Sequence, residues 1–188
     1  YIESISATSK NTFHLLENIL YWARSQSNGL KADLETFAMK ESLSEVLFLA
    51  DKWANNKNIE LKVNIPSELR VHTDKQFLSI ITRNLLNNAI KYSDENSKVV
   101  FTAEQIADKL KVSIRDYGKG ISAEQFRRVL SNDILISTTG TYKETGTGFG
   151  LRLCNELIEY LAGEFYINPE IKSGTEVIFI IPSAIGHI

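Results

Sequence analysis

The 188-residue sequence predicts an α+β fold, a two-layer sandwich with helices on one face of a mixed β-sheet, preceded by one long helix. Helix-like and strand-like segments alternate after about residue 40 without internal repeats, which favours a helix layer packed on a sheet. Residues 2–27 differ, because they contain no glycine or proline and repeat apolar side chains every three or four positions. We therefore expect a stem helix over 1–29, a linker over 30–38 and a globular domain over 39–188.

The composition excludes several classes of protein. Hydrophobic residues make up 43% of the chain, and a formal net charge of −2 gives no reason to expect contact with nucleic acid. The single cysteine, Cys154, excludes an internal disulfide, and His14, His72 and His187 lack the spacing of metal ligands. No apolar run reaches the ~20 residues of a membrane-spanning helix. We expect a cytoplasmic location. Because the chain begins at Tyr1, inside the expected helix, we interpret it as part of a longer protein. The sequence leaves open whether that parent protein is anchored in the inner membrane.

The stem helix is predicted from an apolar stripe that includes Thr12, Leu16, Ile19 and Ala23. This stripe is close to the seam of a helix bundle. The Asn-Gly pair at 28–29 ends the helix, because both residues tolerate the left-handed conformation that is common just after a helix. An exposed apolar stripe of this kind would seek a partner helix.

Three elements are expected in the first half of the globular domain. Residues 40–57 place apolar side chains on one helical face. Residues 59–65 alternate apolar and polar side chains before a proline, which predicts a half-buried strand. A long helix then runs to Tyr92, with Thr73 or Asp74 as its N-cap.

The second half of the domain is expected to complete the sheet. Residues 98–105 and 110–116 read as strands joined by a short turn at 107–108. Two helices, separated by a polar stretch, and a closing hairpin follow. Their expected ranges are 123–130 and 150–161 for the helices, and 164–168 and 175–181 for the strands.

The segment 84–93, Asn-Leu-Leu-Asn-Asn-Ala-Ile-Lys-Tyr-Ser, carries the most chemical information. Asn84 and Asn88 are four residues apart and therefore share a helix face, with Lys91 near the same side. Amide oxygens beside an ammonium group suit a hydrated magnesium ion and the phosphates that it carries, since Mg²⁺ binds through few protein groups plus phosphate and water. An ordinary amphipathic helix with a polar outer face is the alternative.

Two glycine-rich segments and one turn follow. In 116–121, Asp-Tyr-Gly-Lys-Gly-Ile, the carboxylate of Asp116 can accept from an exocyclic amine, and the glycines allow a flat ligand to approach the backbone. In 146–151, Gly-Thr-Gly-Phe-Gly-Leu, the glycines expose N–H groups at a helix start, where phosphate binds. Each segment alone also fits an ordinary turn or helix start. The turn before the last strand lets Thr175 place its hydroxyl beside Asp116. The polar stretch 131–145 is predicted to form a mobile lid over the phosphates.

Together the four segments resemble the catalytic domain of histidine kinases, of the type also found in gyrase-like ATPases. The resemblance spans about residues 37–182 and implies a Bergerat-type ATP-binding fold with ATP and Mg²⁺ as ligands. It implies Asn88 as the magnesium ligand with Asn84 assisting, Lys91 on phosphate, Tyr92 on the adenine and Asp116 on the adenine amino group. The other nucleotide-binding residues that it implies are Gly118, Gly120, Ile121, Gly146, Thr147, Gly148, Phe149, Gly150, Leu151 and Thr175.

The resemblance implies a protein-histidine kinase of two-component signal transduction. Such a domain transfers the γ-phosphoryl group of Mg-ATP to a histidine on the first stem helix, in its own or a partner subunit. The phosphoryl group then passes to an aspartate of a response regulator receiver domain, and the parent protein is expected to be a homodimer. Residues 1–29 resemble the second stem helix, and the only histidine there, His14, lacks the acidic neighbour and the downstream proline of an acceptor. The chain alone is therefore expected to bind ATP without phosphorylating itself.

The sequence also departs from the family pattern. Tyr117 replaces a common asparagine, Phe149 replaces a leucine, and Leu130 takes the place of a phenylalanine. The lid cation stays open between three residues: Arg127, Arg128 and Lys143.

A gyrase-like hydrolase would need a glutamate one turn before the magnesium ligand. Asn84 occupies that position and cannot act as a general base, which favours a kinase. Two alternatives remain: a nucleotide-sensing or dimerisation module that never transfers phosphate, and a serine kinase of the anti-sigma type.

Overall fold

The computed structural model describes residues 31–131 and 149–184. The chain divides into two compact units, residues 1–31 and residues 32–188. The expected stem helix with His14, nearly all of the expected lid with Lys143, and His187 lie outside the described residues, as do Gly146, Thr147 and Gly148.

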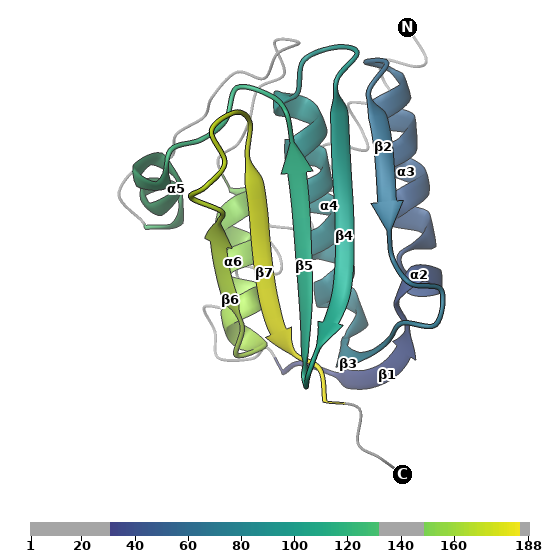
Figure 1. Ribbon diagram of the computed structural model, residues 1–188. Coiled ribbons are helices and arrows are strands. Elements are labelled where there is room, and N and C mark those ends of the chain that lie inside the picture. Colours follow the sequence, from purple (N-terminus) through teal and green to yellow (C-terminus); the bar gives the residue numbers. More distant parts are fainter. Residues whose placement is uncertain (1–30, 132–148, 185–188) are drawn as a thin grey trace, which may run out of the picture. The chain divides into compact units, whose positions relative to one another are not determined.

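A five-stranded mixed sheet is the centre of the second unit (Figure 1). Its strand order is β2-β4-β5-β7-β6. β2 pairs with β4 in parallel, whereas the β4–β5, β5–β7 and β6–β7 pairs are antiparallel. The bounds are β2 (Glu60–Asn64), β4 (Lys98–Ile106), β5 (Lys109–Asp116), β6 (Glu164–Ile167) and β7 (Glu176–Pro182).

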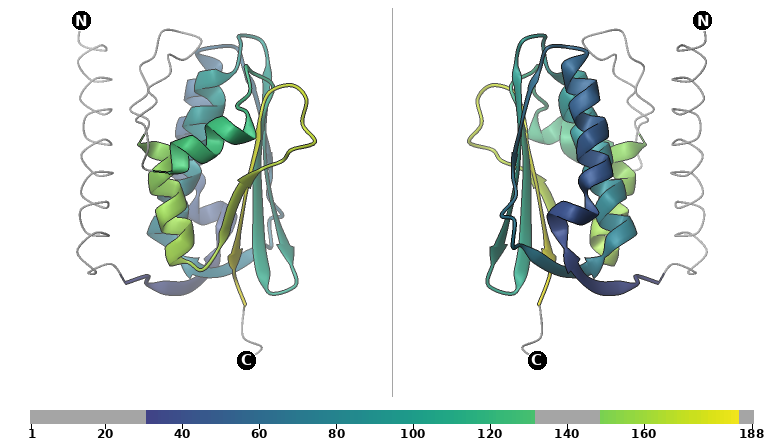
Figure 2. Two further views of the ribbon diagram at one scale, coloured as in Figure 1. Left: turned by 90° about the vertical axis from the view of Figure 1, so that its left-hand side faces the viewer. Right: turned by 90° about the vertical axis from the view of Figure 1, so that its right-hand side faces the viewer.

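Helices cover one face of this sheet (Figure 2). They are α3 (Ser44–Asn55), α4 (Lys75–Tyr92) and α6 (Gly150–Tyr160), with the shorter α5 (Ala123–Leu130) beside α6. Alternation along β5 and along residues 98–103 of β4 places every second side chain between the two layers, where it is buried. The fully buried side chains of this core include Phe101, Ile114, Phe179, Leu78, Ile81, Leu86, Leu153 and Leu157. The predicted two-layer α+β sandwich is therefore confirmed.

Three elements differ from the sequence prediction. Residues 34–38, expected in the linker, form β1 (Leu34–Ala38), which pairs antiparallel with an unexpected β3 (Arg70–Asp74) in a separate two-stranded sheet. The first three side chains of β1 are exposed, so the strand has no apolar alternation to reveal it. The helix expected over 40–57 is split into α2 (Met39–Ser42) and α3, with Leu43 between them.

Helix α4 is fixed at both ends by charged side chains. At its start, Asp74 Oδ1 accepts from Phe77 N at 2.9 Å, as predicted for an N-cap, and Oδ2 accepts from Asp33 N at 2.8 Å. At its end, the buried Lys57 ammonium donates to the carbonyl oxygens of Ile90 and Lys91, each at 3.0 Å. A cation is favourable at a helix C-terminus, where the last carbonyls lack helical partners. The helix that carries Asn84 and Asn88 therefore has fixed ends.

Candidate functional site

The candidate site lies where the ends of three elements meet. The C-terminal end of α4, the last residue of β5 and the start of β7 lie at the same end of the sheet (Figure 1). Asp116, the last residue of β5, is 5% exposed. Its Oδ1 accepts from the N–H groups of Gly118 at 3.0 Å and Thr175 at 3.1 Å, and its own N–H donates to Thr175 O at 2.8 Å. The structure thus brings Asp116 and Thr175 together, as predicted.

Opposing effects act on the Asp116 carboxyl group. Burial raises its pKa above the ordinary value, and the hydrogen bonds from Gly118 and Thr175, together with the charge of Arg115, act against that rise. Among the described residues no main-chain N–H reaches Oδ2, since both of those bonds are to Oδ1. The Thr175 side chain also hydrogen-bonds the carboxyl group, and Oδ2, to which no described main-chain N–H donates, can accept from an amine donor of a ligand.

The loop after β5 packs directly against the end of α4. A Cβ atom added to Gly118 would lie 2.0 Å from Tyr92 O, so only glycine fits there. Lys119 N donates to the same oxygen at 3.3 Å. The buried Lys91 has its Nζ 5.2 Å from the Tyr92 ring centroid. Lys91 and Tyr92 are thereby held next to the loop that follows Asp116.

The turns around Asp116 also require glycine. Gly120 and Gly174 have φ angles of +73° and +72°, a region that other residues rarely adopt. A Cβ on Gly174 would lie 2.2 Å from Asp116 O, and one on Gly120 would lie 2.9 Å from Gly174 O. The loop after β5 and the turn before β7 are therefore in direct contact through their backbones.

Asn84 lies against the first residue of α6. A Cβ atom on Gly150 would be 2.9 Å from Asn84 Oδ1, while Asn84 Nδ2 donates to Ile80 O at 2.8 Å. The side chain of Asn88, one turn further along α4, is half-buried. Two amide oxygens on one helix face fit a magnesium ion that takes its remaining ligands from phosphate and water. The described residues contain no group of three or more His, Cys, Asp or Glu that could hold a metal ion without such help.

The remaining predicted residues are less closely tied to Asp116. Ile121 follows the loop, Phe149 is the N-cap of α6 and Leu151 lies in its first turn, and all three are half-buried. Tyr117, which departs from the family pattern, is 47% exposed, and its ring lies 4.6 Å from the Arg115 guanidinium carbon. Leu130 is the last residue of α5.

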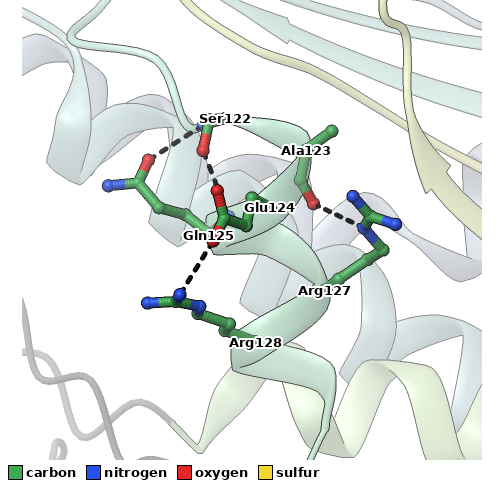
Figure 3. Close-up of polar contacts among 6 residues, drawn as sticks. All are labelled: Ser122, Ala123, Glu124, Gln125, Arg127 and Arg128. Atoms are coloured by element: carbon green, nitrogen blue, oxygen red, sulfur yellow. Dashed lines mark hydrogen bonds and ion pairs between the residues drawn. The ribbon is translucent and has the colours of Figure 1, made fainter.

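Both arginine candidates for the lid cation bond within α5 (Figure 3). Arg128 Nη2 lies 2.8 Å from Glu124 Oε1, and Arg127 Nε donates to Ala123 O at 3.3 Å. Both side chains are exposed, and Ser122 begins the helix with a capping box. These contacts hold Arg127 and Arg128 to their own helix rather than to the loop that follows Asp116.

Sequence reasoning missed two residues that hold the site: Lys57 and Arg115. Lys57 and Arg115 looked like ordinary surface cations, because their acceptors are main-chain carbonyls 33 and 58 residues away. Gly174 belongs to the turn expected before the last strand, and the structure adds its left-handed φ angle of +72°.

Comparison with known proteins gives one family and several relatives. The family model described as "Histidine kinase-, DNA gyrase B-, and HSP90-like ATPase" matches residues 73–185. The adaptive-response sensory kinase SasA of Parasynechococcus marenigrum is 28% identical over 141 residues, covering 74% of this chain and 37% of SasA. The sensor histidine kinase GraS of Staphylococcus epidermidis is 26% identical over 168 residues, covering 89% of this chain and 48% of GraS. The chain thus spans half or less of the length of these curated relatives.

Solved structures of histidine kinases are also similar to this chain. The catalytic domain of histidine kinase ThkA is 28% identical with a TM-score of 0.69, covering 81% of this chain and 97% of that one. Full-length ShkA in complex with AMPPNP has a TM-score of 0.78 at 23% identity and covers 100% of this chain and 39% of that one. ThkA in complex with the response regulator protein TrrA has a TM-score of 0.70 at 24% identity and covers 93% of this chain and 49% of that one. At these identities the last two establish the fold alone.

Proposed function

The chain belongs to the family of histidine kinase-, DNA gyrase B- and HSP90-like ATPases, and from this premise we propose that it is the ATP-binding catalytic part of a two-component sensor histidine kinase. In this proposal it transfers the γ-phosphoryl group of Mg-ATP to a stem histidine of the parent protein. The relatives named sensor histidine kinases support this choice within the family.

The site residues take the following roles in the proposal. The buried carboxylate of Asp116 accepts a hydrogen bond from the adenine amino group, and Tyr92 packs beside the base. Lys91, at the end of α4, contacts phosphate. Asn88, with help from Asn84, holds Mg²⁺, which neutralises phosphate charge when it is bound.

The observation that carries the choice of a kinase over a hydrolase is the composition of α4. This helix runs from Lys75 to Tyr92 and contains no aspartate or glutamate. Asn84 stands one turn before Asn88, and its amide is hydrogen-bonded to its own helix rather than positioned as a base. Water needs a general base to attack ATP efficiently, whereas a neutral histidine is itself a nucleophile. The helix therefore suits transfer to histidine better than hydrolysis.

The partners of the parent protein follow from the same proposal. We propose that the phosphorylated stem passes its phosphoryl group to an aspartate of a receiver domain, and that the parent is a homodimer through its stem helices. The complex of the relative ThkA with a response regulator supports the first point. Within the part of the chain that the structure describes, no helix is both long and apolar enough to cross a membrane.

A transfer assay with γ-labelled ATP tests the proposal. The 188-residue chain is incubated with the labelled nucleotide alone, and then with a peptide of the first stem helix taken from the parent gene. We expect label on the peptide only, with the acid lability and base stability of phosphohistidine, and no faster phosphate release than from ATP alone. Label on His14, removed by His14→Gln, would contradict the acceptor assignment. ATP hydrolysis without transfer would contradict the kinase.

A further inference from the structure

The two segments that hold the Asp116 carboxylate come from distant parts of the chain. Asp116 ends β5, whereas residues 173–175 form the turn before β7, which begins at Glu176. The turn orients the carboxylate, because Thr175 N donates to Oδ1 at 3.1 Å. Residues 173 and 174 lie beyond the last paired residues of the β5–β7 ladder, which ends at Arg115 and Glu176. Beyond the ladder, Asp116 N donates to Thr175 O at 2.8 Å, which holds Thr175 but leaves Ser173 and Gly174 outside the strand pairing.

Arg115 connects these two segments. Its Nη1 donates to Asp116 O at 2.6 Å and its Nη2 donates to Ser173 O at 2.5 Å. The planar guanidinium group thus bridges two main-chain carbonyls with two charge-assisted hydrogen bonds. The ring of Tyr117 lies 4.6 Å from the guanidinium carbon and supports the group from one side.

The Arg115 bridge lies on the face of the sheet that the described helices do not cover (Figure 2). Side chains alternate along β5, so Arg115 and Asp116 lie on opposite faces, and Asp116 is on the helix side with the other buried residues. The loop between β6 and β7 projects from the face opposite the helices (Figure 2). Both of these hydrogen bonds of Arg115 go to main-chain carbonyl oxygens rather than to an acidic side chain.

We propose that Arg115 is a positioning residue that holds the two segments around Asp116 together and thereby sets the selectivity of the site for adenine. The inference rests on the proposed nucleotide-binding function. Adenine presents an amino group where guanine presents a carbonyl oxygen, so a fixed acceptor binds the first base and repels the second. A site built to hydrogen-bond one group discriminates only while its polar atoms are held in place.

The test compares the affinities of the complete 188-residue chain for ATP and GTP, measured by displacement of a fluorescent ATP analogue. Arg115→Met keeps the length of the side chain but removes every donor. We expect ATP to bind about tenfold more weakly, equivalent to about 1.4 kcal/mol, and the ATP-to-GTP selectivity to fall by a similar factor. The affinity and selectivity of Arg115→Lys should lie between those of the wild type and of Arg115→Met. An ammonium group keeps the charge but lacks the planar fork that reaches both carbonyls.

Lys111→Met is the matched control. Lys111 lies on the same face of β5, four residues earlier, and its ammonium binds Glu104 at 3.0 Å, away from the turn. We expect this variant to keep wild-type affinity and selectivity. If Arg115→Met does not fold, Arg115→Lys and Tyr117→Leu carry the test, and both should lose selectivity in the same direction to a smaller extent.

Two results overturn the inference: folded Arg115 variants with wild-type selectivity, or equal weakening of ATP and GTP, which would indicate a structural role only. Failure of the proposed function has a different signature. In that case the wild-type chain itself would bind no ATP, and the inference would fall with it.

Discussion

Replacing Asp116 with asparagine separates its role in binding from its role in folding. The amide oxygen can keep the two hydrogen bonds that Oδ1 now accepts, from Gly118 N at 3.0 Å and Thr175 N at 3.1 Å. The position of Oδ2 becomes an NH₂ group, which is a donor. An amine of the ligand that met an acceptor there would then face another donor. The variant therefore removes one acceptor and changes the shape of the side chain very little.

The size of the effect follows from the type of bond that is lost. A hydrogen bond to a charged acceptor contributes about 1.5–3 kcal/mol, so ATP should bind between about tenfold and about a hundredfold more weakly. The free energy of unfolding without nucleotide should stay the same or rise by up to about 1 kcal/mol, because the buried carboxylate is replaced by a neutral group that keeps its hydrogen bonds. A loss of binding without a loss of stability is the expected result.

The same variant has a defined pH dependence. Burial raises the pKa of Asp116 in the folded chain above its value of 3.8 in an unfolded chain. The folded wild type therefore binds this proton more tightly than the unfolded chain does, so the cost of the buried charge is fully present at neutral pH. That cost disappears as the pH falls through the raised pKa. The stability difference between Asp116→Asn and the wild type should be largest at neutral pH and should close on acidification.

Calorimetric ATP titration and urea denaturation at neutral and acidic pH measure both quantities. Asp74→Asn is the control, because both oxygens of Asp74 accept main-chain hydrogen bonds, from Phe77 N and Asp33 N. It should lose about 1 kcal/mol of stability and keep most of its ATP affinity. Undiminished ATP binding by Asp116→Asn would contradict the assignment of Asp116 to the nucleotide-binding site. A stability loss of more than about 1 kcal/mol would show that the fold needs the charge.

Three further predictions concern the packing around the site. Gly118→Ala should lower the free energy of unfolding by at least about 2 kcal/mol in urea denaturation, because its methyl group would meet the backbone of Tyr92 at 2.0 Å. The control is Gly150→Ala, whose methyl group would meet only a side chain and should cost less than half as much. Lys57→Met should lower the free energy of unfolding by about 2–3 kcal/mol, because two carbonyls at the end of α4 would lose their cation. An unchanged urea midpoint would contradict this prediction. Cys154 should not react with thiol reagents in the folded chain, because burial raises the pKa of its thiol, and rapid labelling under native conditions would disprove it.

Much of the fold was predictable because local patterns agree with it. The alternation in β4 and β5 and the cap at Asp74 are properties of neighbouring residues, and the structure places these elements as expected. β1 and β3 were not predictable, because their pairing depends on residues more than 30 positions apart and most of their outward side chains are polar. The proximity of Asp116 and Thr175 was expected from the position of Thr175 in the turn before the last strand. The contacts of Arg115 and Lys57 with distant carbonyls leave no local signature, so these two residues required the structure.

The pairing of β5 with β7 has a consequence for the synthesis of the protein. A ribosome that has just added Asp116 must add 59 more residues before Thr175 exists, and without Thr175 the carboxylate lacks one of its two main-chain donors. Pairings between such distant segments also form slowly. Nascent or truncated chains that end before β7 should therefore fail to bind nucleotide. Because a ligand stabilises only the state that binds it, cellular ATP would protect finished domains from degradation and leave incomplete ones exposed.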